Sequence, residues 1–352
     1  MSDNSLISII IPHYQGKQIL YECLRSLQQH IKNNYEIIIV DNNSLDSSLV
    51  NINTDFKNIK VVHSNINRGY AGGCNFGSLH AKGDYLIFLN NDTYHTMDWI
   101  QSSYNLLRRF KNVSSVQPKI LNFYEKNKFD YAGGSGGFID YLCYPFVRGR
   151  LFNYLELDSN QYDDACKIFW ASGTAFITKK EIFNQIGGFD EFFFCHMEEI
   201  DYHWKCQSLG YEVWSQPEGF LYHKGGQTLN YGSSEKIFYN HRNSLILLLV
   251  YSNSVQLFYY GILRFSLEFL TFIKYFMSFQ FRACIALIKA WLSIIAHYDY
   301  IINKRKKRVV TQHYDLNSKV EVYQKSIVLK YFLLGVRKFS ELKFTNNNTK
   351  YN

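Results

Sequence analysis

Four short apolar runs, each followed by polar, turn-forming residues, dominate the first quarter of the 352-residue chain. They occupy residues 6–11, 36–40, 59–62 and 85–89. Continuous apolar runs of this length are typical of strands buried on both faces, and helical patterns lie between them at 17–31 and 75–82. Repeated strand–helix units predict an α/β protein with a mainly parallel, Rossmann-like central sheet flanked by helices. In such sheets a ligand binds beyond the carboxyl ends of the strands.

The composition is that of an ordered protein. Hydrophobic residues make up 47% of the chain, enough to bury a sizeable core, and the length fits one large domain with an appendage or two domains. The seven cysteines are scattered and form no Cys-x-x-Cys pair, which argues against a zinc site and a disulfide framework. The first residues contain neither a basic region nor a long apolar run, so we expect a cytoplasmic chain.

The middle of the chain is less regular. Residues from about 119 to 166 are rich in glycine, which predicts a hairpin or loop excursion. Regular patterns return with a strand at 169–178 and helices at 180–186 and 198–209. Gly210 is a suitable end for the last of these helices.

The chain becomes aromatic and apolar after about residue 232. Residues 244–263 carry no charge, but polar side chains interrupt the run at 252–256. The segments 265–281 and 283–302 are apolar with isolated charges. This pattern favours amphipathic helices that lie in a membrane interface over helices that cross it, and a helical subdomain packed on the first half is the alternative.

Five consecutive cations at 304–308 account for much of the formal net charge of +8. Such a run attracts anionic lipid or forms a solvated face, and nucleic acid is not an expected partner because no recognised binding module accompanies it. We expect an α/β domain over 1–232, a membrane-associating helical region over 233–343 and a flexible tail over 344–352. The expected location is the inner face of the cell membrane, with the chain bound peripherally.

Polar clusters follow the first two predicted strands. Pro12, His13 and Tyr14 end the first strand, and Asp41 and Asn43 follow the second. A carboxylate at a strand end is placed to accept a hydrogen bond from a base or a ribose hydroxyl. Asp41 equally suits a turn or a cap, and that reading stays open.

A glycine-rich cluster precedes the helix predicted at 75–82. It contains Asn67, Arg68, Gly69, Gly73 and Asn75. Glycines let the backbone approach a ligand closely, and the N–H groups at a helix start suit an anion. The spacing differs from Gly-x-Gly-x-x-Gly and follows a later strand, which argues against a dinucleotide site.

Two acidic clusters complete the pattern. Asn90-Asn91-Asp92 follows the fourth strand, and Asp92 suits Mg²⁺ or Mn²⁺ as a ligand, or simply a turn. Glu198, Glu199 and Asp201 begin a predicted helix beside several aromatic residues. Aromatic surroundings would raise the pKa of a carboxyl group toward that of a useful general base, although acids at a helix start also complement its dipole.

Together these clusters resemble the inverting nucleotide-sugar glycosyltransferases of family 2, which have the GT-A fold, and within them a rhamnosyltransferase-like branch. The matching segments include Asn67-x-Gly69, Gly72-Gly73-x-Asn75 and Gly187-Gly188-Phe189-Asp190-Glu191. The resemblance covers about residues 6 to 230 and extends into 239–243.

The resemblance implies a role for each cluster. The implied donor-binding residues are Pro12, His13, Tyr14, Asp41, Asn43, Asn67, Arg68, Gly69, Gly73, Asn75 and Asn91. The implied ligands of Mg²⁺ or Mn²⁺ are Asp92 and His223, and the implied acceptor side consists of Trp170, Gly173 and Asp190. Glu199 matches the acidic base, with Glu198 and Asp201 as alternatives.

Two positions depart from the family pattern. Asn90 stands where the Asp-x-Asp metal motif has its first acid, and Glu199 stands where many relatives have Asp. We therefore hold two hypotheses. The first is a metal-dependent enzyme that moves rhamnose or a related sugar from dTDP-rhamnose or a UDP-sugar, with inversion, to a lipid-linked or cell-surface polysaccharide acceptor. The second is a non-catalytic nucleotide-sugar or glycan-binding module with a degenerate metal site.

Overall fold

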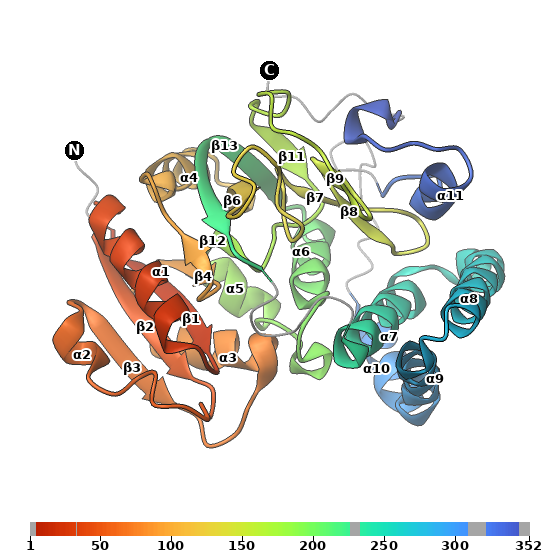
Figure 1. The fold of residues 1–352 in the computed structure, drawn as a ribbon, viewed down its shortest axis with the longest axis horizontal. Helices are drawn as coiled ribbons and strands as arrows, with labels where there is room; N and C mark the ends of the chain where they lie inside the picture. The colour runs from red at the N-terminus through yellow and green to blue at the C-terminus, as the bar shows by residue number, and fades with distance from the viewer. Residues whose placement is uncertain (1–4, 33, 226–232, 309–321, 345–352) are drawn as a thin grey trace.

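The computed structural model describes residues 5–32, 34–225, 233–308 and 322–344 (Figure 1). Over these residues the core is one nine-stranded sheet in the order β11-β13-β6-β12-β4-β1-β2-β3, with β5 pairing β13. Its strands are β11 (Cys166–Ile168), β13 (Glu212–His223), β6 (Val113–Asn122), β12 (Ala175–Lys179), β4 (Tyr85–Leu89), β1 (Ile7–His13), β2 (Tyr35–Asp41), β3 (Ile59–His63) and β5 (Thr93–Tyr94).

The four strands expected from the apolar runs are β1 to β4, and they pair in parallel with one another. The register places His13 directly beside Asp41, so the polar clusters that follow β1 and β2 meet at one edge. Beyond β4 the sheet becomes mixed, because β12 runs antiparallel to both β4 and β6. The predicted α/β fold class is confirmed.

Alternate residues of the parallel strands enter two different cores. Ile9 and Ile11 pack with α1 (Lys17–His30) and α4 (Trp99–Arg109) on one face. Ile10 packs on the other face with three helices. These are α3 (Gly69–Ser78), α5 (Lys180–Ile186) and α6 (Glu198–Ser208). Because both faces are covered, the middle residues of β1, β2 and β4 are almost all apolar, whereas Lys60 of the edge strand β3 is exposed.

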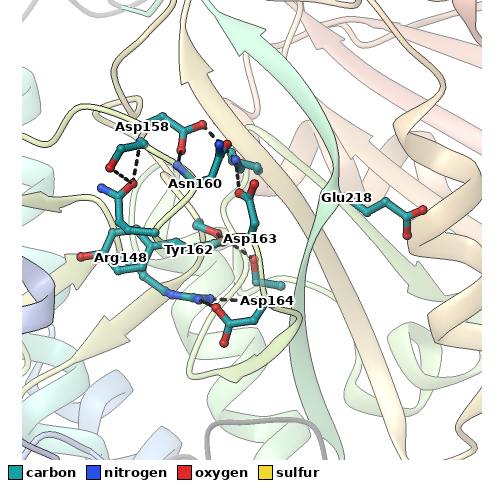
Figure 2. Close-up of polar contacts among 12 residues, drawn as sticks. Arg148, Asp158, Asn160, Tyr162, Asp163, Asp164 and Glu218 are labelled. Carbon is teal, nitrogen blue, oxygen red and sulfur yellow. Dashed lines mark hydrogen bonds and ion pairs between the residues drawn. The ribbon is translucent and has the colours of Figure 1, made fainter.

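The glycine-rich excursion forms a second, four-stranded sheet that the sequence did not predict. Its strands are β7 (Gly137–Ile139), β8 (Pro145–Val147), β9 (Arg150–Leu151) and β10 (Tyr154–Leu155). These strands are too short to show a period-2 pattern. An ion-pair network holds the loop after β10: the buried Lys119 ammonium contacts Asp158 and Asp163, and Arg148 faces Asp164 (Figure 2).

Strand β13 was also missed, although it decides the geometry of the site. The sequence Ser-Gln-Pro-Glu-Gly at 215–219 interrupts its pattern, and the structure accommodates this break with a register shift against β6 between Gln216 and Phe220. The far end of β13 pairs with β5, which sets His223 opposite Thr93. A residue near the end of the α/β region is thereby placed beside the loop that follows β4.

Helices α7 to α10 form a cluster at the end of the molecule opposite β3 (Figure 1). They are α7 (Ser234–Tyr251), α8 (Ser254–Met277), α9 (Phe281–Ala296) and α10 (Tyr298–Lys307). The uncharged run at 244–263 is therefore two helices, because Asn253 caps α8 by accepting a hydrogen bond from the Gln256 backbone N–H. Within the described ranges no single helix is long and apolar enough to span a membrane; α9 and α10, bent by 65°, pass that test only as a pair.

The last described segment returns to the small sheet instead of staying with these helices. The Tyr323 backbone N–H donates to the Ile139 carbonyl at 2.9 Å, and α11 (Ile327–Phe332) and a short helix at Phe339–Glu341 follow. The expected domain boundary at 232/233 coincides with the end of the undescribed stretch 226–232. The expected flexible tail lies, apart from Phe344, outside the described residues.

Candidate functional site

His13 lies at the sheet edge where β1 ends. Its Nδ1 accepts a hydrogen bond from Asn91 Nδ2 at 2.8 Å, and its Nε2 lies 2.7 Å from the Ser48 hydroxyl. Burial lowers the pKa of His13 to about 4, so the ring is neutral. Because Nδ1 accepts from Asn91, the ring proton is on Nε2, which donates a hydrogen bond to the Ser48 hydroxyl. His13 thus ties the loops after β1, β2 and β4 into one floor.

Asp41 lies beside His13 on the rim of this floor. One carboxylate oxygen accepts from the Ser44 backbone N–H at 2.8 Å, and the other lies 2.9 Å from His63 Nδ1. Partial burial opposes ionisation, but the hydrogen bonds from Ser44 and His63 outweigh it and hold the pKa of Asp41 below its usual value. Asp41 is therefore an anion at neutral pH. The expected donor residues Tyr14 and Asn43, half-buried and exposed respectively, lie at the same edge.

Asn42, which was not among the expected residues, organises the glycine-rich loop. Its Nδ2 donates to the Gly69 carbonyl at 2.9 Å, and its Oδ1 accepts from the Arg68 backbone N–H at 2.9 Å. Gly69 has φ +67°, and a Cβ there would lie 2.3 Å from the Phe194 carbonyl oxygen. The expected donor residues 67–69 are therefore held between the end of β2 and the loop that precedes α6.

Helix α3 packs closely on β1. A Cβ at Gly73 would lie 3.1 Å from that of Pro12, which explains why a small residue stands there. Asn75, expected to bind donor, instead exchanges hydrogen bonds at 2.9 Å with the Phe189 carbonyl and N–H. Its amide is fully used in joining α3 to the Gly-Gly-Phe segment, so its part in the site is to position the loop.

The pairing of β13 with β5 brings the expected metal ligands Asp92 and His223 together. Asp92 Oδ1 lies 3.1 Å from His223 Nε2, and both residues are buried. Asp130, which no sequence pattern indicated, lies with its Oδ1 2.9 Å from His223 Nδ1. Burial opposes the charge on His223, but the carboxylates of Asp92 and Asp130 outweigh it and hold the pKa of His223 well above its usual value.

This arrangement fits a divalent ion. The hydrogen bond to Asp130 orients the ring, and the buried His223 Nε2 and Asp92 Oδ1 face each other at 3.1 Å with no hydrogen bond to a third described group. No three His, Cys, Asp or Glu side chains in the described ranges are grouped to hold an ion alone. Mg²⁺ and Mn²⁺ sites in phosphate-transferring proteins often use one or two protein ligands and complete their shell with substrate phosphates and water. Asp92 and His223 would supply the protein share.

Asp130→Asn should weaken Mn²⁺ binding by about 10–100-fold, because the second carboxylate fixes the histidine ring and raises its basicity. The measurement is the free Mn²⁺ signal in electron paramagnetic resonance, titrated with protein in the presence of UDP. Asp164→Asn, which removes the partner of Arg148 instead, serves as the matched control. Equal Mn²⁺ affinity of Asp130→Asn and the parent would show that Asp130 does not support the site.

Glu198 and Glu199 begin α6 next to the loop described above. Burial and the neighbouring Glu199 hold the pKa of Glu198 well above its usual value, so Glu198 stays protonated. Burial raises the pKa of Glu199 to about 7. Each has an Oε2 atom that is buried and has no hydrogen-bond partner. Glu199 is the more exposed of the two, and its pKa suits a proton acceptor at neutral pH.

Asp201 differs sharply from its two neighbours. The carboxylate is fully buried and contacts the ammonium groups of Lys205 and Lys304 at 2.8 and 2.9 Å, and it accepts from the Tyr251 hydroxyl at 2.9 Å. Burial opposes ionisation, but the two lysines outweigh it and lower the pKa of Asp201 to about 2. A buried anion with saturated oxygens is a poor proton acceptor, so the structure favours Glu199 over Asp201 as the base.

Two of the expected acceptor residues have structural partners instead. Asp190 contacts Lys304 and the Tyr300 hydroxyl of α10, and accepts from the Phe192 backbone N–H. Trp170 is buried, and its Nε1–H donates to the Phe138 carbonyl at 2.8 Å. These contacts engage the polar atoms of both side chains within the protein, and their expected place on the acceptor side stays a prediction. The Gly173 carbonyl accepts from the Tyr70 hydroxyl, which ties the turn before β12 to α3.

The loop before α6 is strained and held from outside. Phe194, His196 and Met197 all have positive φ, which costs a non-glycine residue about 1 kcal/mol each. Asn243 of α7 donates from one amide group to the carbonyls of Phe193, Cys195 and His196, at 2.7–3.0 Å. Asn243 belongs to the segment 239–243, which is part of the resemblance to family 2 but had no expected role. Through these contacts it fixes the backbone that precedes Glu198 and Glu199.

The sequence of the α/β region decides the family. Residues 8–187, which are 180 of 352, match the profile described as Glycosyl transferase family 2. The chain belongs to glycosyl transferase family 2. The family 2 profile covers β1 to β12 and the loops that carry His13, Asp41 and Asp92, and it ends before the acidic start of α6.

Two curated proteins illustrate the similarity. The chain is 37% identical over 105 residues to a poly(ribitol-phosphate) beta-glucosyltransferase of Bacillus spizizenii, covering 28% of this chain and 17% of that protein. It is 31% identical over 130 residues to the UDP-Glc:alpha-D-GlcNAc-diphosphoundecaprenol beta-1,3-glucosyltransferase WfaP of Escherichia coli, covering 36% and 50%. The matched regions therefore span half or less of these two relatives.

A solved structure shares the fold of this family 2 chain. The structure of GalNAc-T7 with UDP, GalNAc and Mn²⁺ superposes with a TM-score of 0.57 at 15% identity, over 72% of this chain and 49% of that one. At this identity the likeness shows the fold alone, and it agrees with the GT-A architecture expected from the sequence.

Proposed function

We propose that this protein transfers a sugar from a nucleoside-diphosphate donor to an acceptor hydroxyl with inversion at the anomeric carbon. The observation that carries the proposal is the pair of buried carboxyl groups on α6, one neutral and one with a pKa of about 7. The pair lies beside α3, where the Ala71 backbone N–H donates to the Phe194 carbonyl at 3.1 Å. This arrangement supports Glu199 as a proton acceptor beside the expected donor-binding residues.

The reaction needs one proton acceptor and one bond exchange. Glu199 takes the proton of the acceptor hydroxyl as its oxygen attacks the anomeric carbon from the face opposite the diphosphate. The bond between that carbon and the leaving phosphate oxygen breaks in the same displacement, and the nucleoside diphosphate departs with the electron pair. Glu198, protonated alongside, keeps a second negative charge away from Glu199 until the acceptor proton arrives.

The expected donor-binding residues offer partners for both the nucleoside and the diphosphate of a donor. Asp41 is ionised at the rim and would accept from a ribose or base donor, while Arg68, half-buried beside Ser64, would face the diphosphate. Asp92 and His223 would hold Mg²⁺ or Mn²⁺. When bound, the ion neutralises charge that develops on the leaving diphosphate.

The sugar is the finer part of the proposal. The resemblance to the rhamnosyltransferase-like branch favours dTDP-rhamnose, while WfaP, by its name, uses UDP-glucose. The acceptor is proposed to be a lipid-linked or cell-surface polysaccharide; by their names, WfaP acts on alpha-D-GlcNAc-diphosphoundecaprenol and the Bacillus spizizenii relative on poly(ribitol-phosphate). A non-catalytic sugar-nucleotide-binding module is the second candidate, favoured by Asn90 in the first position of the metal motif.

The test is a donor screen. The full chain in mild detergent with Mn²⁺ and extracted acceptor lipids should release nucleoside diphosphate from one donor in a panel that includes dTDP-rhamnose and UDP-glucose. Chelation, Asp92→Ala and Glu199→Gln should each abolish release. Donor binding without release from any donor, acceptor present, would favour the binding module.

A further inference from the structure

The outer face of α8 carries a continuous stripe of exposed apolar side chains. Its main members are Phe258, Ile262, Phe265, Phe269, Ile273 and Phe276, each more than 40% exposed. They recur every three or four residues, so they lie along one side of the helix. The opposite side packs inward through Leu267 and the buried pair Arg264 and Glu268.

Helix α9 continues this surface. Phe281, Ile285, Ile288, Leu292 and Ile295 form a second stripe at the same spacing, each at least 39% exposed. The other side of α9 is apolar too, and its small buried residues pack on α7. A helix that is apolar all round belongs in a protein core or in lipid, and one face of α9 has no protein cover in the described structure.

The charges on this surface are all of one sign. The exposed charged side chains of α8 and α9 are Lys274, Arg282 and Lys289, and the single acid of the two helices, Glu268, is buried against Arg264. A second copy of the chain packed on this face would bring cations against cations, whereas an anionic bilayer supplies both the apolar interior and the negative surface.

We propose that the α8–α9 face docks in the headgroup region of an anionic lipid bilayer. Helix α7 lies between this face and the loop that precedes Glu199, because Asn243 of α7 holds that loop and α9 packs on α7. Figure 1 shows α8 and α9 at the outer end of the helical cluster. The loop that precedes Glu199 would thus lie about one helix diameter, roughly 10 Å, from the docked helices. Glu199 would then be within reach of a lipid-linked acceptor. The acceptor part rests on the proposed function; the docking itself does not.

Vesicle flotation with the full chain tests the docking without any turnover. The parent protein should float with vesicles of phosphatidylcholine and phosphatidylglycerol, and bind pure phosphatidylcholine much more weakly. The triple variant Phe258→Gln, Phe265→Gln, Phe269→Gln should lose about 100-fold in partition coefficient, because three side chains no longer enter the interface. Replacing Lys274, Arg282 and Lys289 with Gln should cost about fivefold per charge on the anionic vesicles.

The matched control is Leu79→Gln, Tyr124→Gln, Leu157→Gln, which removes three equally exposed apolar side chains from other surfaces. This control should float like the parent. Failure of the parent to bind, equal binding to neutral vesicles, or equal loss in control and test variants would each overturn the proposal. So would concentration-dependent self-association that the Phe→Gln variant abolishes without any vesicle binding. Donor release measured without vesicles reports separately on the proposed function.

Discussion

Glu199→Gln should lower the transfer rate by about 10²–10⁴-fold while donor affinity stays within a factor of about three. The amide keeps the shape of the side chain but takes no proton from the acceptor hydroxyl. In the parent protein the rate should rise about tenfold per pH unit below 7 and level off above it, since Glu199 with its pKa of about 7 must be ionised. The measurement is single-turnover transfer from pH 5 to 9.

Glu198→Gln is the matched control for this prediction. Because Glu198 is already protonated at neutral pH, its neutral isostere should keep the rate within about tenfold. A larger loss in Glu198→Gln than in Glu199→Gln would reassign the base to Glu198.

Glu199→Gln should also stabilise the fold at neutral and alkaline pH. The pKa of Glu199 rises from 4.5 in an unfolded chain to about 7 in the fold. A raised carboxyl pKa costs nothing below pH 4.5, destabilises the folded state progressively as pH rises from 4.5 to about 7, and keeps that full cost at higher pH. Removing that cost should gain about 1–3 kcal/mol at pH 8, seen as a higher Tm of Glu199→Gln at pH 8 and an unchanged Tm at pH 4.

Asn243→Ala should lower kcat by about 10²-fold with little change in donor KM. The substitution removes the amide that donates to Phe193, Cys195 and His196, so the strained backbone before α6 relaxes and moves Glu199. Loss of the three hydrogen bonds should also cost about 2–4 kcal/mol of stability. Stopped assays at saturating acceptor, with thermal unfolding in parallel, measure both effects.

Asn303→Ala is the control. Asn303 is an exposed residue of α10, so the substitution shortens the same kind of side chain on a helix of the same cluster. It should leave kcat and Tm close to those of the parent. A fall in Tm for Asn243→Ala without a selective fall in kcat would mean that Asn243 supports the fold but does not position the base. A shift of the pH–rate midpoint in Asn243→Ala would add direct evidence for positioning.

The parallel half of the fold could be read from the sequence, because strands buried on both faces are apolar over several consecutive residues, as at 9–11, 37–40 and 86–89. The edge that joins His13 and Asp41 follows from parallel pairing alone. The small sheet and β13 could not be read, because strands of two or three residues have no period and Pro217 breaks the pattern of β13. Their physical signal is pairing with distant strands, which a local pattern does not contain.

The candidate site divides in the same way. Asp92 and His223 were expected from motifs, and the structure brings them together. Asp130 reaches His223 from 93 residues away, through a loop with no distinctive pattern, and only the fold reveals it. Asn75, Trp170 and Asp190 show a different limit of motifs. Each matches a family motif, yet each side chain is used for internal hydrogen bonds, and a motif does not distinguish a residue that builds a pocket from one that lines it.

The basic run at 304–308 has a consequence for how this protein can be truncated or recombined with its relatives. Three of its five cations turn inward: Lys304 neutralises Asp190 and Asp201, and Arg305 and Arg308 donate to backbone carbonyls at the end of α7. A chain cut before α10 would leave the carboxylate of Asp201 buried with one lysine fewer, two residues from Glu199. The α/β region is therefore not an independent domain that can be moved without α10. Its last neutralising charge is encoded about a hundred residues downstream, so a swap of C-terminal helices between relatives would have to carry that lysine along.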